Sequence, residues 1–310
     1  MADNQYWRGY ALGTLAALCA SFFFIPYKEA MQTIPAEVFT AGMMLAAGLL
    51  HLPPLTVTPA ARQVNRKALL AALVFAILSN LGNYGIGRAL VEGEPAVIVT
   101  VLRMQVLMVM VLSAVFLRER VGPVLIIGGI VALCGFAVIA TDGKEVSLSN
   151  LSSVLWALFA VLNLASVHVL IKGVIAYTHP LTFNLMRLLL CFLIMLPVPG
   201  VLPSLLALPP EAWLLIFGSA LCGPTLSRVS GIFALVYIPV SRYIMFTLLI
   251  PIFALISGYF LFDRLPSAHA LAGSGLILGG IMLPLLTGLR AGQTAPPPAE
   301  EAVAINTPRP

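Results

Sequence analysis

Charged residues are scarce in this chain, and their scarcity excludes the ordinary soluble folds. Asp, Glu, Lys and Arg make up 9% of the 310 residues, whereas hydrophobic residues make up 60%. A soluble domain of this length cannot bury so much apolar surface. The mean hydropathy is +1.01, a value typical of chains embedded in lipid. The composition therefore predicts an all-α integral membrane protein.

Acidic residues are missing from the interior of every apolar run, because all 12 lie in loops, in tails or at the ends of runs. The four cysteines lie within apolar runs and form no Cys-x-x-Cys pair, so they are interpreted as packing residues. The chain also lacks an HExxH motif, a phosphate-binding loop and paired intramembrane acids. The sequence predicts a protein that is not an enzyme and that uses no cofactor, no metal and no nucleic acid.

Ten apolar runs are present, each close to the ~20 residues that a helix needs to cross the hydrocarbon layer. They lie at about 9–25, 35–52, 68–88, 95–117, 121–140, 151–173, 180–199, 212–235, 239–262 and 267–288. The sequence thus predicts ten transmembrane helices, five on each side of a polar break near residues 141–149.

The second half of the chain repeats the first at an offset of about 145 residues. Five spans in each half, an odd number, make the two copies enter the membrane in opposite senses, as in inverted-repeat carriers. We therefore predict a first five-helix repeat at 9–140 and a second at 151–289. The remainder, 290–310, is rich in Pro and Ala and is expected to be a disordered tail.

The distribution of basic residues predicts the orientation in the membrane. If the N-terminus is cytoplasmic, about ten Lys and Arg residues lie on the inside and four on the outside. Cytoplasmic loops carry the excess of basic residues in membrane proteins. Both termini are therefore predicted in the cytoplasm, in a multi-pass protein of the plasma membrane.

Three arginines lie within apolar runs, where a charge is costly and usually marks a cavity or a pathway. They are Arg103, Arg187 and Arg228. Arg103 lies nine residues past Glu94, which places it ~13 Å into the bilayer. Thr100 shares its helical stripe. The alternative interpretation is that these side chains reach the headgroups or pair with a backbone carbonyl.

Uncharged polar residues within the runs form a second group of candidates for substrate binding. They are Asn80, Asn83, Tyr84, Asn163, Ser166, His168 and Tyr243. Four positions on one face of the third run, Asn80, Asn83, Tyr84 and Gly87, together favour a wet surface. Packing between helices explains each residue taken singly. Pro251 interrupts the ninth run and is a candidate hinge, with or without contact to a ligand.

A short element occurs in both halves, at corresponding places. The first copy has Ala89-Leu90-Val91 and then Phe116-Leu117-Arg118-Glu119-Arg120, and the second has Ala234-Leu235-Val236 and then Phe260-Leu261-Phe262-Asp263-Arg264. This pattern resembles the paired EamA domains of the drug/metabolite transporter superfamily. The resemblance implies a ten-helix carrier whose central cavity is bounded by the first, third, fourth, sixth, eighth and ninth helices. It also implies the export of small metabolites such as amino acids.

The chain departs from related small multidrug carriers, which exchange protons for cationic drugs through a glutamate in the first helix. Here the first run has no acid before Glu29, at its outer end. The sequence instead favours a carrier of a carboxylate-bearing solute that works by alternating access, because the charges within its runs are positive. The alternatives are a phosphorylated or nucleotide-linked solute, a channel, and a non-transporting scaffold or sensor. The sequence leaves the oligomeric state, the substrate identity and the energy coupling open.

Overall fold

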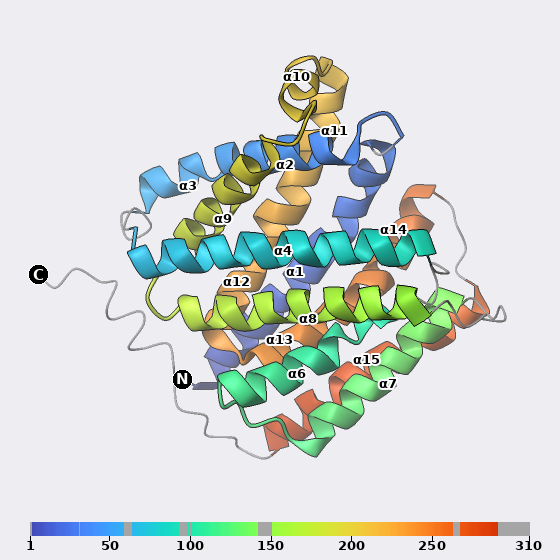
Figure 1. Cartoon of the computed structure of the whole chain (residues 1–310). Coiled ribbons are helices and arrows are strands. Elements are labelled where there is room, and N and C mark those ends of the chain that lie inside the picture. Colours follow the sequence, from blue (N-terminus) through green and yellow to red (C-terminus); the bar gives the residue numbers. More distant parts are fainter. Residues whose placement is uncertain are drawn as a thin grey trace, which may run out of the picture. The chain divides into compact units, whose positions relative to one another are not determined.

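The computed structural model describes residues 2–30, 32–58, 64–92, 98, 101–141, 151–262 and 267–290. The regular secondary structure of these residues is entirely helical (Figure 1). This result confirms the predicted all-α class. In lipid a chain satisfies its backbone N–H and C=O groups most directly within a helix, which is why long apolar runs become helices.

Within the described ranges, six helical segments are long and apolar enough to cross a membrane. They are Gln5–Tyr27, Ala36–Pro54, Arg66–Ala89, Leu151–Val174, Pro210–Tyr237 and Val240–Ser257. Four shorter apolar helices occupy the other predicted runs, at Val101–Phe116, Pro123–Ile139, Pro180–Met195 and Ala268–Pro284. The structure therefore supports a multi-pass protein, and the count of ten spans stays a prediction.

Some of the shorter helices end early for a local reason. The run predicted at 180–199 forms a helix only to Met195, because Pro197 and Pro199 lack the N–H that a helix needs. Gly200 follows with a φ of 83°, a left-handed conformation that glycine adopts without steric cost.

Packing divides the chain into two compact units, and each takes helices from both halves of the sequence. The first unit holds Met1–Ala76 and Val174–Tyr237, and the second holds Ile77–Gly173 and the described part of Ile238–Pro297. The boundaries of the two predicted repeats are therefore not the boundaries of the packing units.

The first unit is built from α1, α2, α3, the start of α4, α9, α10, α11, the π-helix η2 and α12. Their bounds are α1 Ala2–Ala30, α2 Ala36–Leu50, α3 Leu52–Val57, α4 Arg66–Glu92, α9 Pro180–Met195, α10 Val201–Leu206, α11 Pro210–Ala220, η2 Leu221–Ser227 and α12 Arg228–Tyr237. Helix α2 packs against α9 and α11, and α1 packs against α11, η2 and α12.

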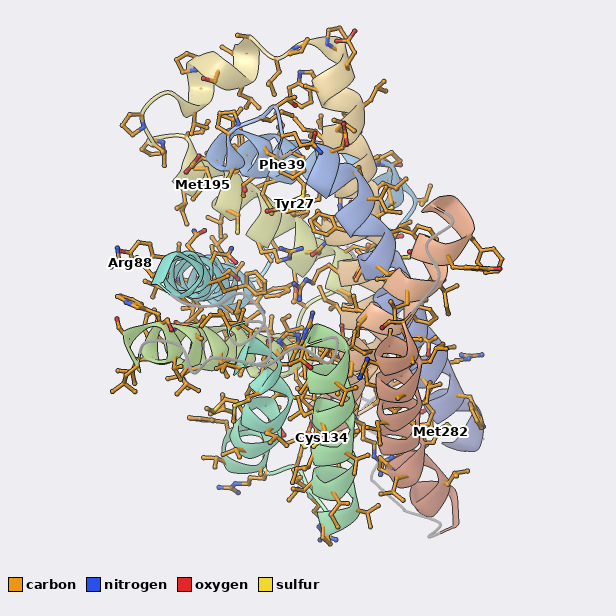
Figure 2. All side chains as sticks on the ribbon, turned by 90° about the vertical axis from the view of Figure 1, so that its right-hand side faces the viewer. Tyr27, Phe39, Arg88, Cys134, Met195 and Met282 are labelled. Carbon is orange, nitrogen blue, oxygen red and sulfur yellow. The ribbon has the colours of Figure 1, made fainter. Side chains whose placement is uncertain are left out.

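The core of the first unit contains large apolar side chains with no exposed surface, among them Phe39, Leu188 and Ile216. The ring of Tyr27 in α1 meets that of Phe39 in α2 edge to face, with centroids 5.3 Å apart (Figure 2). This core holds α1, α2, α9 and α11 together.

Helix α9 begins at a side-chain cap. The Nδ1 atom of His179 accepts a hydrogen bond from the backbone N–H of Leu181 at 3.3 Å. Burial lowers the pKa of His179, which keeps the ring neutral and able to accept this bond. The cap satisfies one of the free N–H groups at the helix start.

The second unit is built from the rest of α4 together with α6, α7, α8, α13, η3, α14 and α15. Their bounds are α6 Gln105–Phe116, α7 Pro123–Thr141, α8 Leu151–Val174, α13 Val240–Phe246, the 3-10 helix η3 Thr247–Leu249, α14 Ile250–Phe262 and α15 Ala268–Arg290. The ninth predicted run is thus divided at η3, just before Pro251, whose missing N–H cannot continue an α-helical ladder. The role of Pro251 as a hinge stays a prediction.

Helices α7 and α15 lie side by side along most of their length (Figure 1). Figure 2 shows the same pair, with Cys134 labelled on α7 and Met282 on α15. A Cβ atom added at Gly135 would lie 2.5 Å from the carbonyl oxygen of Gly273, and one at Gly280 would lie 2.5 Å from that of Gly128. The two backbones therefore approach closely through facing glycines, a common device in membrane helix pairs.

The glycines that make this contact differ in part from those that a small-xxx-small pattern indicates. Gly275 and Gly279 have that spacing in α15, yet a Cβ added at either would meet nothing within 4 Å. The contact uses Gly273 and Gly280, seven residues apart on the opposite side of the helix. A spacing of four in the sequence does not show which face of a helix meets its neighbour.

We expect Gly273→Ala to destabilise the protein by about 1–3 kcal/mol, because the new methyl group would overlap the backbone of α7. The matched control is Gly275→Ala, which removes a helix-weakening glycine from open space and should be neutral or slightly stabilising. Thermal unfolding of both purified variants in one detergent would compare them. Equal melting temperatures for the two variants would contradict the close approach of α7 and α15.

Candidate functional site

A buried arginine lies in the middle of α9, in the first unit. Arg187 is 4% exposed, and its Nε donates a hydrogen bond to Oδ1 of Asn184 at 2.7 Å. Its Nη2 donates a longer one to the carbonyl oxygen of Pro224 at 3.5 Å. Asn184 and Arg187 are three residues apart, so the helix itself places them on one face. The guanidinium is therefore held in one orientation, with donors left over.

The amide of Asn184, which is fully buried, connects Arg187 to His51. Its Nδ2 donates to Nε2 of His51 at 2.7 Å and to the carbonyl oxygen of Pro224 at 3.0 Å. The other ring nitrogen of His51, Nδ1, lies 2.7 Å from the carbonyl oxygen of Ala47. A carbonyl oxygen only accepts, so Nδ1 carries the hydrogen and Nε2 accepts from Asn184.

Every atom in this chain of hydrogen bonds thus has one fixed role. The Arg187 side chain has only donors, which requires the Asn184 oxygen to face it and the amide nitrogen to face His51. A proton added to Nε2 of His51 would place a donor against a donor. The network therefore holds His51 in its neutral form and Arg187 in place.

The carbonyl oxygen shared by Asn184 and Arg187 belongs to a π-helix. Pro224 lies inside η2, where it interrupts the α-helical hydrogen-bond ladder between α11 and α12. Single π-helical turns within longer helices occur often at functional sites. The next residue, Thr225, has a buried hydroxyl with no hydrogen-bond partner among the residues that the structure describes. A buried unpaired hydroxyl is a candidate contact for a ligand.

Two guanidinium groups face the same aromatic ring. The Cζ atoms of Arg187 and Arg228 lie 5.0 Å and 6.0 Å from the ring centroid of Phe75, a buried residue of α4. Each is within the range of a cation–π contact. In the described part of the chain, no carboxylate forms an ion pair with either arginine. The two like charges repel each other, and an anion bound beside them would relieve that repulsion.

Arg103, in the second unit, lies at a break in the helix. It precedes Met104, a turn residue that separates it from α6, and its Cζ lies 5.0 Å from the centroid of Phe136. No acid among the described residues forms an ion pair with it either. Thr100, its predicted neighbour on the same stripe, lies outside the described residues.

The structure brings two other predicted residues of the second unit together. The rings of His168 in α8 and Tyr243 in α13 have centroids 6.1 Å apart. Nδ1 of His168 also lies 3.2 Å from Nε2 of Gln105 and 3.0 Å from the carbonyl oxygen of Leu164. This cluster joins α6, α8 and α13 through polar side chains.

The remaining predicted residues of the second unit do not converge in this way. Asn163 and Ser166 bond to carbonyl oxygens of their own helix, those of Phe159 and Leu162, each at 2.8 Å. Asn80 has a buried Nδ2 with no partner among the described residues. Asn83 and Tyr84 are exposed, and the ring of Tyr84 stands edge to face on Trp156 at 5.7 Å.

The acidic residue of the repeated sequence element caps a helix. Oε1 of Glu119 accepts the backbone N–H of Val240 at 2.8 Å, and Oε2 accepts that of Ser241 at 3.0 Å. Both bonds lie at the start of α13, where a negative charge is favourable. Lys172, near the end of α8, donates to the carbonyl oxygen of Ile238 at 3.1 Å and interacts electrostatically with Glu119.

The turn after α6 presents Glu119 to that helix. Arg118 has a φ of 55°, a left-handed conformation that reverses the chain direction at the end of α6. The element Phe116-Leu117-Arg118-Glu119-Arg120 therefore has a structural task, which is to join α6 to α13. Asp263, its counterpart in the second copy, lies outside the described residues.

A model described as the EamA-like transporter family matches residues 7–141 and, separately, residues 151–286. The chain belongs to the EamA-like transporter family. A comparison with functionally curated proteins finds no match. A solved structure described as "Crystal structure of protein" is similar to this EamA-like chain, with a TM-score of 0.72 at 17% sequence identity. The match covers 92% of this chain and 99% of that one, and it supports the fold.

Membership of the EamA-like family confirms the resemblance that the repeated element indicates. It also identifies the chain as a multi-pass membrane protein of a transporter family. The two matched segments each contain one copy of the repeat, so the internal similarity and the family describe the same duplication.

Sequence reasoning found both arginines of the first unit but missed the residues that orient them. His51, Asn184 and Phe75 are neither charged nor grouped in the sequence, and a search for buried charge passes over them. The spacing of Asn184 and Arg187, three residues apart in one apolar run, was the available indication. Glu119 lies just past the end of an apolar run, as the sequence indicates, but its bonds to Val240 and Ser241 are visible only in the structure.

Proposed function

We propose that this EamA-like protein is a permease that moves a small organic solute across the plasma membrane by alternating access. The proposed solute bears a carboxylate, as an amino acid or a related metabolite does, and the proposed direction is export. Both termini are proposed to be cytoplasmic. The observation that supports the substrate class is the pair formed by Arg187 and Arg228, which lacks an acidic partner among the described residues. Guanidinium groups bind carboxylates through paired hydrogen bonds.

The residues proposed to bind the solute include a third arginine, Arg103, and a set of uncharged polar residues. That set consists of Asn80, Asn83, Tyr84, Thr100, Asn163, Ser166, His168 and Tyr243. The cation–π contact of Arg103 with Phe136 leaves its hydrogen-bond donors available for an anionic group. Pro251, at the start of α14, is the proposed hinge.

We expect Arg103→Gln to lower the initial rate of solute uptake into inside-out vesicles at least roughly tenfold. The anionic group of the bound solute would lose the desolvated guanidinium that pairs with it. The assay uses a labelled panel of amino acids, organic acids, sugar phosphates and a lipophilic cation. The control is Arg120→Gln, which removes an exposed arginine of the same unit and should leave the rate unchanged. Normal uptake by Arg103→Gln would mean that Arg103 does not bind the solute.

A second candidate solute is phosphorylated or linked to a nucleotide. This alternative requires two arginines to converge on one group, and the approach of Arg187 and Arg228 to Phe75 favours it. Saturable uptake of a sugar phosphate in the same panel would support it. If no member of the panel is taken up saturably, a non-transporting scaffold or sensor is the better description.

A further inference from the structure

We infer that the Arg187–Arg228 pair binds an organic dianion, so that the solute carries two negative charges rather than one. This inference rests on the proposed function and narrows its substrate class. Three features support it: the balance of charge around Phe75, the hydrogen-bond acceptors there that are already occupied, and the hydrogen-bond donors there that are still free among the described residues.

The charges around Phe75 are not balanced within the first unit. Arg187 and Arg228 contribute two positive charges, and the hydrogen bonds of His51 keep that ring neutral. The described carboxylates of the first unit, on Glu29, Glu37 and Glu211, are exposed, and none is paired with these arginines. Arg187 is buried and Arg228 is half-buried, and an uncompensated charge is costly in a medium of low dielectric constant. A ligand with two negative charges would make the site neutral.

A zwitterionic amino acid fits the same residues poorly. Its carboxylate would meet an arginine, but its ammonium group would add a third positive charge. That ammonium group needs a carboxylate or an aromatic face, and the ring of Phe75 already faces two guanidinium groups. The carbonyl oxygen of Pro224 already accepts from Asn184 and Arg187.

The free donors define how the dianion would be held. Arg187 uses Nε on Asn184 and Nη2 on Pro224, which leaves Nη1 and part of Nη2 for a ligand. The Arg228 side chain forms no hydrogen bond with any residue that the structure describes, so its whole planar fork is available. The buried hydroxyl of Thr225, in the same π-helix as Pro224, is a further donor. A dicarboxylate or a phosphate monoester would satisfy this set.

The experiment compares ligands that differ in charge but not in size. Succinate carries two negative charges at pH 8, and succinamate replaces one of its carboxylates with an amide of the same shape. Binding of each to the purified full-length protein is measured by titration calorimetry at constant ionic strength. Glycerol 3-phosphate tests the phosphate form of the dianion, and leucine represents the zwitterions.

For the wild-type protein we expect one of the two dianions to bind at least about tenfold more tightly than succinamate and leucine, a difference of ~1.4 kcal/mol. Arg228→Gln should reduce that preference to within about twofold, because the second charge no longer has a partner. Arg228→Lys keeps the charge and should keep most of the preference. Arg8→Gln removes an exposed arginine of the same unit and should bind as the wild type does.

Three results would overturn the inference: equal binding of succinate, glycerol 3-phosphate and succinamate, tighter binding of leucine, or a preference that survives Arg228→Gln. A flux assay in proteoliposomes separates this failure from that of the proposed function. Saturable flux of leucine alone would retain the carrier and reject the dianion. Binding of a dianion without flux of any member of the panel would retain the site and reject the carrier.

Discussion

Replacing Asn184 with Leu should lower the free energy of unfolding by about 3–5 kcal/mol, although the two side chains are similar in size. The amide of Asn184 is the partner of His51, Arg187 and the Pro224 carbonyl at once. Leu would leave a buried ring nitrogen and a buried guanidinium nitrogen without their hydrogen bonds. An unpaired buried polar group costs roughly 1–3 kcal/mol, and more if it is charged.

Asn163 is a matched control, because it is also a helical asparagine with little exposure, at 6%. Among the residues that the structure describes, its Nδ2 bonds only to the carbonyl oxygen of Phe159, one turn earlier in the same helix. Asn163→Leu therefore leaves no distant group unpaired and should cost no more than about 1 kcal/mol. Unfolding of both variants in mixed micelles would measure the two losses. Similar losses would show that the Asn184 network does not stabilise the first unit.

A double-mutant cycle tests the same network in a second way. His51→Leu removes the ring that Asn184 contacts, so the combined variant should be less destabilised than the sum of the two single variants by about 0.5–3 kcal/mol. Additive losses would indicate that the two side chains act independently. The cycle also reports on Arg187, which would lose its orienting partner in either variant that lacks Asn184.

Replacing Glu119 with Ala should destabilise the protein by about 3–5 kcal/mol and should release the start of α13. Each of its carboxylate oxygens accepts a backbone N–H, and hydrogen bonds to charged groups contribute roughly 1.5–3 kcal/mol each. The substitution also removes the negative charge next to Lys172. Glu119→Gln keeps one acceptor oxygen and should show about half of the effect.

Hydrogen exchange at the amides of Val240 and Ser241 measures the cap directly. We expect their protection to fall in Glu119→Ala, while the amides in the middle of α8 keep theirs. Arg120→Gln, at the next position, changes an exposed side chain and should alter neither stability nor exchange by a measurable amount. Unchanged protection of both amides in Glu119→Ala would exclude the capping role.

The sequence alone determined the helical class and the family. Both depend on properties that each segment carries by itself: an apolar run must satisfy its backbone within a helix when it lies in lipid, and a repeated element is visible without any fold. It also located Arg187 and Arg228, because a charge is costly at any position inside an apolar run, whatever its neighbours are.

Only the tertiary structure showed what surrounds those charges. His51 and Asn184 are 133 positions apart, and Phe75 comes from a third helix. Their roles follow from directional contacts between helices. The sequence of an uncharged side chain's own helix does not indicate which distant residue it contacts. The same holds for Gly273, which contacts α7 while Gly275 does not, and for Glu119, whose partners lie about 120 residues further along.

Composition and periodicity determine which segments become helices. Packing decides which helix faces meet, because it joins residues that are distant in the chain.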